Sequence, residues 1–173
     1  MTFERIALAP LLTLSLALSA CAARDDLRGS LGEAYPLHFE HVRARLQESG
    51  LAIEYVDVHG AVPVRVSLRR GVVPVAGGRY DLALEGDVTG ETHDGLGILR
   101  FSKGELELDE FRAEEGARVT GRFDVDFPID ERVLSLHGEF SAPIDLVGWT
   151  VPSDDAASDS DATSEDAPET ETP

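Results

Sequence analysis

Arg118-Val-Thr-Gly-Arg-Phe-Asp-Val-Asp-Phe127 alternates polar and apolar side chains along its length. Successive side chains of a β-strand point to opposite faces, whereas a helix repeats every three to four residues. Period two therefore places one set of residues on a buried face: Val119, Phe123, Val125 and Phe127. The charged residues between them face solvent, so the stretch predicts a half-buried β-strand.

The same period recurs on both sides of this strand. Segments 62–68, 80–84 and 134–141 alternate in the same way and predict further strands. Segment 36–46 also fits a helical stripe, but a hairpin turn follows it directly, and we predict a strand there. Turn residues separate the segments: Glu48-Ser49-Gly50, Ala76-Gly77-Gly78, Ser102-Lys103-Gly104, Glu115-Gly116 and Asp130-Glu131.

Short connections between strands favour antiparallel neighbours, so the sequence predicts an all-β fold, an antiparallel meander of about eight strands. A weak repeat of apolar, polar, glycine, polar, apolar residues places Gly86, Gly121 and Gly138 on the inward side of their strands. Glycine inside a strand marks a bend or a close backbone approach. Both a sandwich and a small barrel satisfy this pattern. The outward face is densely charged and poor in aromatics, unlike that of a transmembrane barrel.

The amino terminus carries the most specific motif. Residues 6–18 form a short apolar run that ends in Leu18-Ser19-Ala20-Cys21. This resembles the bacterial lipobox, in which a branched apolar residue and two small residues precede an obligatory cysteine. The resemblance implies a lipoprotein signal peptide over 1–20, cleavage before Cys21, and lipid (palmitate among its acyl chains) on that thiol. Ala22 in the following position favours the outer membrane, facing the periplasm or the surface.

The rest of the chain divides by composition. Residues 21–34 are predicted to be the lipidated cysteine and a flexible tether, 35–151 the β domain, and 152–173 a disordered acidic tail. The tail holds eight acids among Ser, Thr, Ala and Pro, with no aromatic or basic residue. It cannot bury enough surface to offset its ordering entropy. Its simplest interpretation is a solvated brush.

Charge and cysteine content exclude some functions. The formal net charge of -18 argues against nucleic acid as a partner, because phosphate backbones are bound by stripes of Lys and Arg. The chain has one cysteine, so it forms no intramolecular disulfide.

The five histidines do not suggest a metal site. His38 and His41 would lie on opposite faces of a strand, His59 and His93 fall in loops, and His137 faces outward. Structural zinc requires three or four converging ligands. We therefore predict neither a metal nor a cofactor.

The acidic residues are also read as surface groups. Asp124 and Asp126 share a face with Arg118 and Arg122 nearby, and they lack the spacing of a calcium loop. No serine-nucleophile or zinc-protease motif is found in the sequence. We predict no catalytic residue and no enzymatic activity.

Two aromatics mark candidate recognition points: Trp149 after the last strand and Tyr35 at the start of the body. Each is more simply explained by packing. The expected function is that of a membrane-anchored, non-enzymatic envelope lipoprotein with a structural or protein-interaction role. Its partners would be the membrane, through Cys21, and other envelope proteins. The alternative is a carrier that holds a lipid or hydrophobic molecule in a closed barrel. A hydrolase would require a pocket that joins two perturbed carboxylates.

Overall fold

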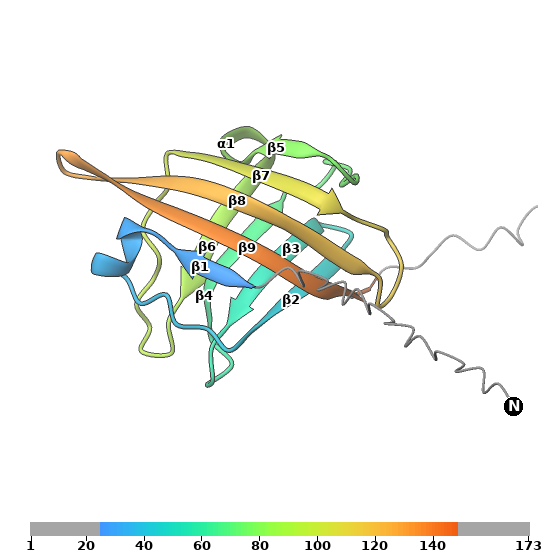
Figure 1. Cartoon of the computed structure of the whole chain (residues 1–173), viewed down its shortest axis with the longest axis horizontal. Helices are drawn as coiled ribbons and strands as arrows, with labels where there is room; N and C mark the ends of the chain where they lie inside the picture. Colours follow the sequence, from blue (N-terminus) through green and yellow to red (C-terminus); the bar gives the residue numbers. More distant parts are fainter. Residues whose placement is uncertain (1–24, 149–173) are drawn as a thin grey trace, which may run out of the picture.

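The computed structural model describes residues 25–148, and Cys21, Trp149 and the acidic tail lie outside them. Figure 1 shows one strongly curved sheet. Two short helices of four residues each accompany it within residues 25–148. The elements are β1 (Asp26–Arg28), η1 (Ser30–Glu33), β2 (His41–Gln47), β3 (Gly50–Val56), β4 (Val62–Leu68), β5 (Arg79–Asp81), α1 (Leu82–Glu85), β6 (Gly86–Glu91), β7 (Lys103–Glu110), β8 (Arg118–Ile129) and β9 (Arg132–Leu146).

The sheet is built from two antiparallel meanders. Its strand order is β5-β7-β8-β9-β2-β3-β4-β6, and β1 pairs with β9 outside this path. The meanders meet where Ala44–Leu46 of β2 pairs in parallel with Ile144–Leu146 of β9. In Figure 1, β7, β8 and β9 cross in front of β2, β3, β4 and β6. The two ends of the sheet, β5 and β6, are joined by α1, so the sheet is nearly closed into a barrel. The predicted all-β fold is confirmed.

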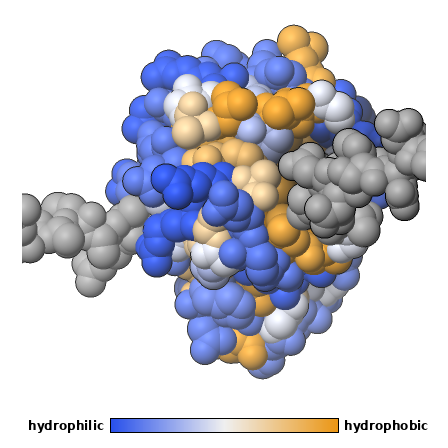
Figure 2. Space-filling model, turned by 90° about the vertical axis from the view of Figure 1, so that its right-hand side faces the viewer, coloured by the Kyte–Doolittle hydropathy of each residue, from blue (hydrophilic) through white to orange (hydrophobic). Residues whose placement is uncertain are grey.

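Apolar side chains from both meanders fill the interior. The largest fully buried residues include Tyr55, Phe123, Phe127 and Phe140. Outside, charged and apolar residues are interspersed, and Figure 2 shows hydrophobic patches on a largely hydrophilic face. Apart from these patches, side chains that face outward are polar and side chains that face inward are apolar, which is the arrangement that period two predicts.

Two of the inward glycines accommodate aromatic rings across the β8–β9 hairpin. Phe123 pairs with Gly138, and Phe140 pairs with Gly121. A Cβ on Gly138 would overlap the ring of Phe123, and a Cβ on Gly121 would lie 2.8 Å from Cζ of Phe140. The predicted close approach is therefore confirmed at both glycines, where each ring covers backbone that has no side chain of its own.

Tyr55 on β3 forms a hydrogen bond with β9 near the point where β9 changes its neighbouring strand. β9 pairs with β1 around Gly138 and with β2 only from Ile144 onward. At the end of the β1 pairing, the Tyr55 hydroxyl donates a hydrogen bond of 2.8 Å to the carbonyl oxygen of Glu139, the residue that pairs with Asp26. Burial, and secondarily the nearby carboxylates of Asp25, Asp26 and Glu139, raises the pKa of Tyr55 above its ordinary value.

The strand predicted over 80–84 is wrong in its second half. β5 ends at Asp81, and α1 begins at Leu82. The Asp81 carboxylate accepts from Ala83 N at 2.9 Å, and Asp81 N donates to Glu85 Oε2 at 2.9 Å. These reciprocal bonds cap a helical turn and override the alternation. Leu84 consequently points outward and is 73% exposed.

Three other boundaries differ from expectation. Segment 36–46 becomes a strand only from His41. The predicted turn at Ser102-Lys103-Gly104 is the start of β7, where buried Gly104 allows close packing against Leu82 and Val125. The predicted tether over 21–34 is folded from Asp26, because β1 pairs with β9 and Leu31 is fully buried. The sequence did not predict this folded segment, because Leu27 and Leu31 are isolated among polar residues and form no periodic pattern.

Candidate functional site

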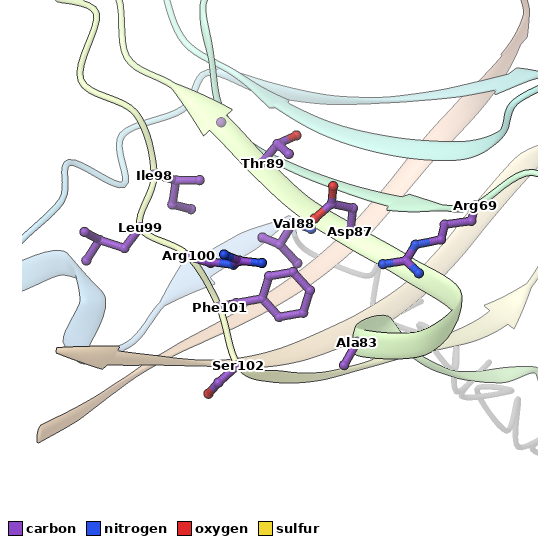
Figure 3. Close-up of a pocket in the computed structure, with 11 residues that line it drawn as sticks. Arg69, Ala83, Asp87, Val88, Thr89, Ile98, Leu99, Arg100, Phe101 and Ser102 are labelled. Atoms are coloured by element: carbon purple, nitrogen blue, oxygen red, sulfur yellow. Dashed lines mark hydrogen bonds between the residues drawn. The ribbon is translucent and has the colours of Figure 1, made fainter.

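One hollow lies at the seam, the gap between β6 and the start of β7 that α1 bridges. We call it the seam groove. It has a volume of about 570 Å³, and Figure 3 shows its lining. The lining comes from β6, from residues 98–102, and from the ends of β4 and α1: Arg69, Ala83, Asp87, Val88, Thr89, Gly90, Ile98, Leu99, Arg100, Phe101 and Ser102.

One edge of β6 opens toward this groove. β4 occupies the other edge of β6. Away from β4, the Gly90 carbonyl accepts from Ile98 N at 2.9 Å, so residues 96–98 cover the end of the strand. Backbone groups alternate along a strand, which places the N–H and C=O of Val88 on the same side as those of Gly90. Within residues 25–148 the Val88 carbonyl has no backbone partner.

Asp87 protects this open edge. Its Oδ1 accepts the N–H of the next residue, Val88, at 2.9 Å. The carboxylate therefore occupies a donor that a neighbouring strand would otherwise use. A charged side chain at such a position hinders indiscriminate strand pairing, and a ligand strand would have to displace it.

Two arginines enter the groove from opposite sides. Arg69 follows β4, and its Nη1 donates to the carbonyl oxygen of Leu84 at 3.1 Å. Arg100 comes from the segment that leads into β7. In the view of Figure 3, Val88 and the Phe101 ring lie between the two guanidinium groups. Neither arginine forms an ion pair with any residue of 25–148.

The groove has an apolar floor. Val88 is 4% exposed, and Ile98, Leu99 and Phe101 are half-buried against the core. The groove lining contains no histidine, so neither Thr89 nor Ser102 has an imidazole base beside it in the groove. Exposed guanidinium groups, an apolar floor and the Val88 carbonyl equip the groove for binding an extended anionic ligand.

A smaller pocket of about 270 Å³ gathers three of the histidines. His38, His59 and His93 line it together with Phe39, and the rings of His59 and His93 are 4.4 Å apart between centroids. Both histidines lie in turns, as expected. That they meet was not expected.

Carboxylates hold this histidine pocket in shape. The Nε2 of His93 lies 3.0 Å from Oδ1 of Asp94, and its Nδ1 lies 3.9 Å from Oδ2 of Asp57. Asp57 also accepts the N–H groups of His59 and Ala61 at 2.8 and 2.9 Å, which fixes the β3–β4 turn. Within residues 25–148, no three Cys, His, Asp or Glu side chains converge as a metal site.

The candidate residues from the sequence are dispersed. Cys21 and Trp149 lie outside the described residues. Tyr35 is 2% exposed and donates to the carbonyl oxygen of Pro63 at 2.9 Å, so it packs rather than recognises a partner. Burial, with a smaller contribution from Glu91, raises the pKa of Tyr35 to about 12. His137 faces outward between Asp124 and Glu139.

No family model, curated protein or solved structure matches this chain. No helix in residues 25–148 is long and apolar enough to cross a membrane.

Sequence reasoning missed the seam groove entirely. Period two placed Arg69 on the outward face at the end of the strand that begins at Val62, and it left the segment around Arg100 unassigned. One signal was available, the apolar run Leu96-Gly-Ile-Leu-Arg-Phe101, which has no turn residue after Gly97 yet matches no strand pattern. An apolar segment without a period is typical of chain that covers an opening in the core.

Proposed function

We propose that this protein is a lipid-anchored component of the bacterial cell envelope whose β domain binds other envelope proteins without catalysing a reaction. The observation that carries this proposal is the open edge of β6 beside the seam groove. An exposed edge with unpaired backbone groups is a template for another chain. The rest of the domain is a closely packed support for that edge.

The proposed anchor would hold the domain close to the membrane. Acylation at Cys21 is inferred from the lipobox resemblance of residues 18–21. The folded domain begins at Asp26. Five residues of extended chain span at most about 18 Å, so β1 would sit within roughly that distance of the lipid. A partner in the same membrane, or on its surface, would then meet the domain at high effective concentration.

The alternative, a carrier with a ligand inside the barrel, is less well supported. Rings of Tyr55, Phe123 and Phe140 occupy the interior where a ligand would lie. Phe39 and Phe123 both contact Tyr55 edge to face, with centroids 5.0 and 5.9 Å away. A barrel of about eight strands has just enough room for such side chains or for one small ligand, not for both.

The anchor is tested at one residue. In cells, Cys21→Ser should abolish metabolic labelling with a palmitate analogue and move the protein from the membrane fraction to the soluble or unprocessed pool. Ser49→Cys, in the exposed β2–β3 turn, is the control for unspecific thiol labelling. Labelling that persists in Cys21→Ser would contradict the anchor.

The binding role is tested by photocrosslinking in cells. A photoreactive amino acid at Thr89 or Ser102, both exposed in the groove, should yield a discrete protein adduct. The same probe at Glu131 or Asp145, exposed elsewhere on the domain, should not yield that adduct. If native mass spectrometry instead finds a small molecule that leaves on denaturation, and no groove adduct forms, the carrier function replaces this proposal.

A further inference from the structure

We propose that the seam groove binds an extended acidic peptide segment, which adds to the sheet as a strand along β6 and places carboxylates on Arg69 and Arg100. This rests on the proposed binding function and names the chemistry of the partner. Three independent properties of the groove lead to it: the backbone of β6, the unpaired arginines, and the apolar floor between them.

The backbone argues for a strand rather than for a compact ligand. On the side away from β4, the end of β6 and the residue after it already form backbone hydrogen bonds with residues 96–98. Ile98 N donates to the carbonyl oxygen of Gly90, and Thr92 N donates to the carbonyl oxygen of Leu96. The molecule therefore uses this edge for strand pairing at one end. The pairing stops before Val88, where the same edge borders the groove. A peptide could continue the pairing at the Val88 carbonyl, but not as far as Gly86, whose N–H already donates to Leu82 O.

The charges argue for an acidic peptide. The chain carries a net charge of -18, so a locally cationic groove stands out. Several arginines of the sheet are matched to carboxylates, Arg43 and Arg65 to Glu54 and Arg79 and Arg122 to Glu107, whereas Arg118 and Arg132 form no ion pair within residues 25–148. What distinguishes Arg69 and Arg100 is that they line the same groove. Arg69 and Arg100 have no carboxylate partner among residues 25–148. Guanidinium groups bind carboxylates with paired, charge-assisted hydrogen bonds.

The floor argues for an apolar side chain between the acids. Val88 and Phe101 lie between the two guanidinium groups in Figure 3. Alternate residues of an added strand point to the same side. A segment with acidic residues flanking an apolar one would therefore satisfy both arginines and cover Val88 and Phe101. A free phosphate or a lipid headgroup would satisfy the arginines but could not donate a strand-type hydrogen bond to the Val88 carbonyl and also cover the apolar floor.

The test uses the full protein, purified from producing cells in mild detergent, and a displayed library of random heptapeptides as the probe. We expect enrichment of peptides with acidic residues around an apolar one. Arg69→Ala and Arg100→Ala should each weaken the selected peptides roughly tenfold, as expected for loss of a charge-assisted hydrogen bond. Arg70→Ala is the matched control, because Arg70 is exposed, adjacent in sequence and absent from the groove lining.

Strand addition is tested separately with N-methylated versions of a selected peptide. Methylation of every second amide removes either the donors that face β6 or those that face away. One methylated series should lose binding and the other should keep it. Equal tolerance of both series would overturn strand addition.

Other outcomes overturn the peptide chemistry without removing the function. If the library enriches neutral or basic peptides, or yields none, or if the arginine variants bind as the wild type does, the proposed ligand is wrong. The groove adduct from photocrosslinking would in that case still support a protein partner. If anionic phospholipid vesicles compete for the groove while peptides do not bind, the arginines serve the membrane surface instead.

Discussion

The β8–β9 hairpin and the seam between β6 and the start of β7 are opposites within one sheet. In the hairpin, every residue from Arg118 to Ile129 has a partner on β9. At the seam, β5 pairs over only three residues, and β6 leaves part of one edge open. The hairpin contributes fully buried rings to the core, whereas the seam is closed by a single helical turn and an irregular segment.

The difference indicates which part of the domain contributes most to its stability and which part is available for binding. Where strand pairing is complete and packing is tight, a ligand can contact only the outward side chains. Incomplete pairing costs stability locally but leaves backbone donors, acceptors and unmatched charges exposed. We therefore expect substitutions in the hairpin to change the free energy of unfolding, and substitutions at the seam to change binding.

The largest contrast should come from a pair of phenylalanines. Phe140 on β9 is 1% exposed, whereas Phe101 at the seam is half-buried. Phe140→Ala should lower the free energy of unfolding by about 4 kcal/mol, and Phe101→Ala by about 1–2 kcal/mol. Chemical denaturation with two probes measures both. Equal losses would mean that the seam is as tightly packed as the hairpin.

A pair of glycines sharpens the same comparison. In Gly138→Ala the new Cβ meets the Phe123 ring, and the domain should lose about 2–3 kcal/mol. In Gly97→Ala, at the seam, the nearest atom is the Gly90 carbonyl oxygen at 4.0 Å, so the change should stay within about 0.5 kcal/mol. Adding Phe123→Leu to Gly138→Ala should restore part of the loss, because the smaller side chain makes room for the methyl group. Failure of this rescue would mean that the Tyr55 hydroxyl, which lies 2.9 Å from the new Cβ, and not the Phe123 ring, is responsible.

How much could be foreseen from the sequence follows the same division. Alternation is a local property, so it predicted β4, β8 and β9, the turn at Asp130-Glu131 and the glycines that face the rings. It failed at Asp81, where reciprocal capping bonds with Ala83 and Glu85 outweigh a pattern of apolar residues. A capping residue and a strand residue look alike until the bonds they make are known.

The seam groove could not be predicted from the sequence for a different reason. Arg69, Val88 and Arg100 come from three separate segments, and they meet only because the sheet curves until β6 approaches β7. That curvature depends on the parallel contact between β2 and β9, which joins the two halves of the chain. No local pattern encodes a contact of that range. The close approach of His59 and His93 could not be predicted for the same reason.

A third comparison sets a paired arginine against an unpaired one. Arg43 Nε lies 2.5 Å from Oε2 of Glu54, whose side chain is 3% exposed, and Arg65 is farther away at 3.6 Å. Arg43→Ala leaves a buried carboxylate poorly matched, and should cost about 2 kcal/mol. Arg69→Ala should change the free energy of unfolding by less than about 0.5 kcal/mol. A large loss in Arg69→Ala would show that this side chain supports the fold rather than a ligand.

A further effect is confined to alkaline pH. The folded state raises the pKa of Tyr35 to about 12 and that of Tyr55 further, so both phenols stay protonated where the unfolded chain begins to lose its protons. Stability should be insensitive to these groups below pH 10, then fall as the pH rises from about 10 to 12. Tyr35→Phe should flatten this decline. An unchanged slope in the variant would contradict the assignment to Tyr35. Equilibrium unfolding at a series of pH values measures it.

A small effect on stability, and the most informative one for the seam, should come from Asp87. Its carboxylate holds one backbone donor of an exposed edge, a bond worth about 1 kcal/mol. Asp87→Ala should therefore unfold almost as the wild type does. It should nevertheless bind acidic peptides more tightly, because the Val88 N–H becomes free and a repelling charge leaves the groove.

The same substitution should increase pairing between copies of the chain, visible as concentration-dependent sedimentation, because an unguarded edge accepts any strand. Asp109→Ala removes an exposed β7 carboxylate outside the groove, and should change neither property. If Asp87→Ala also leaves peptide binding and sedimentation unchanged, the edge of β6 is not available to another strand. In that case the gap in pairing at the seam is only a defect that the fold tolerates, and the contrast with the hairpin concerns stability alone.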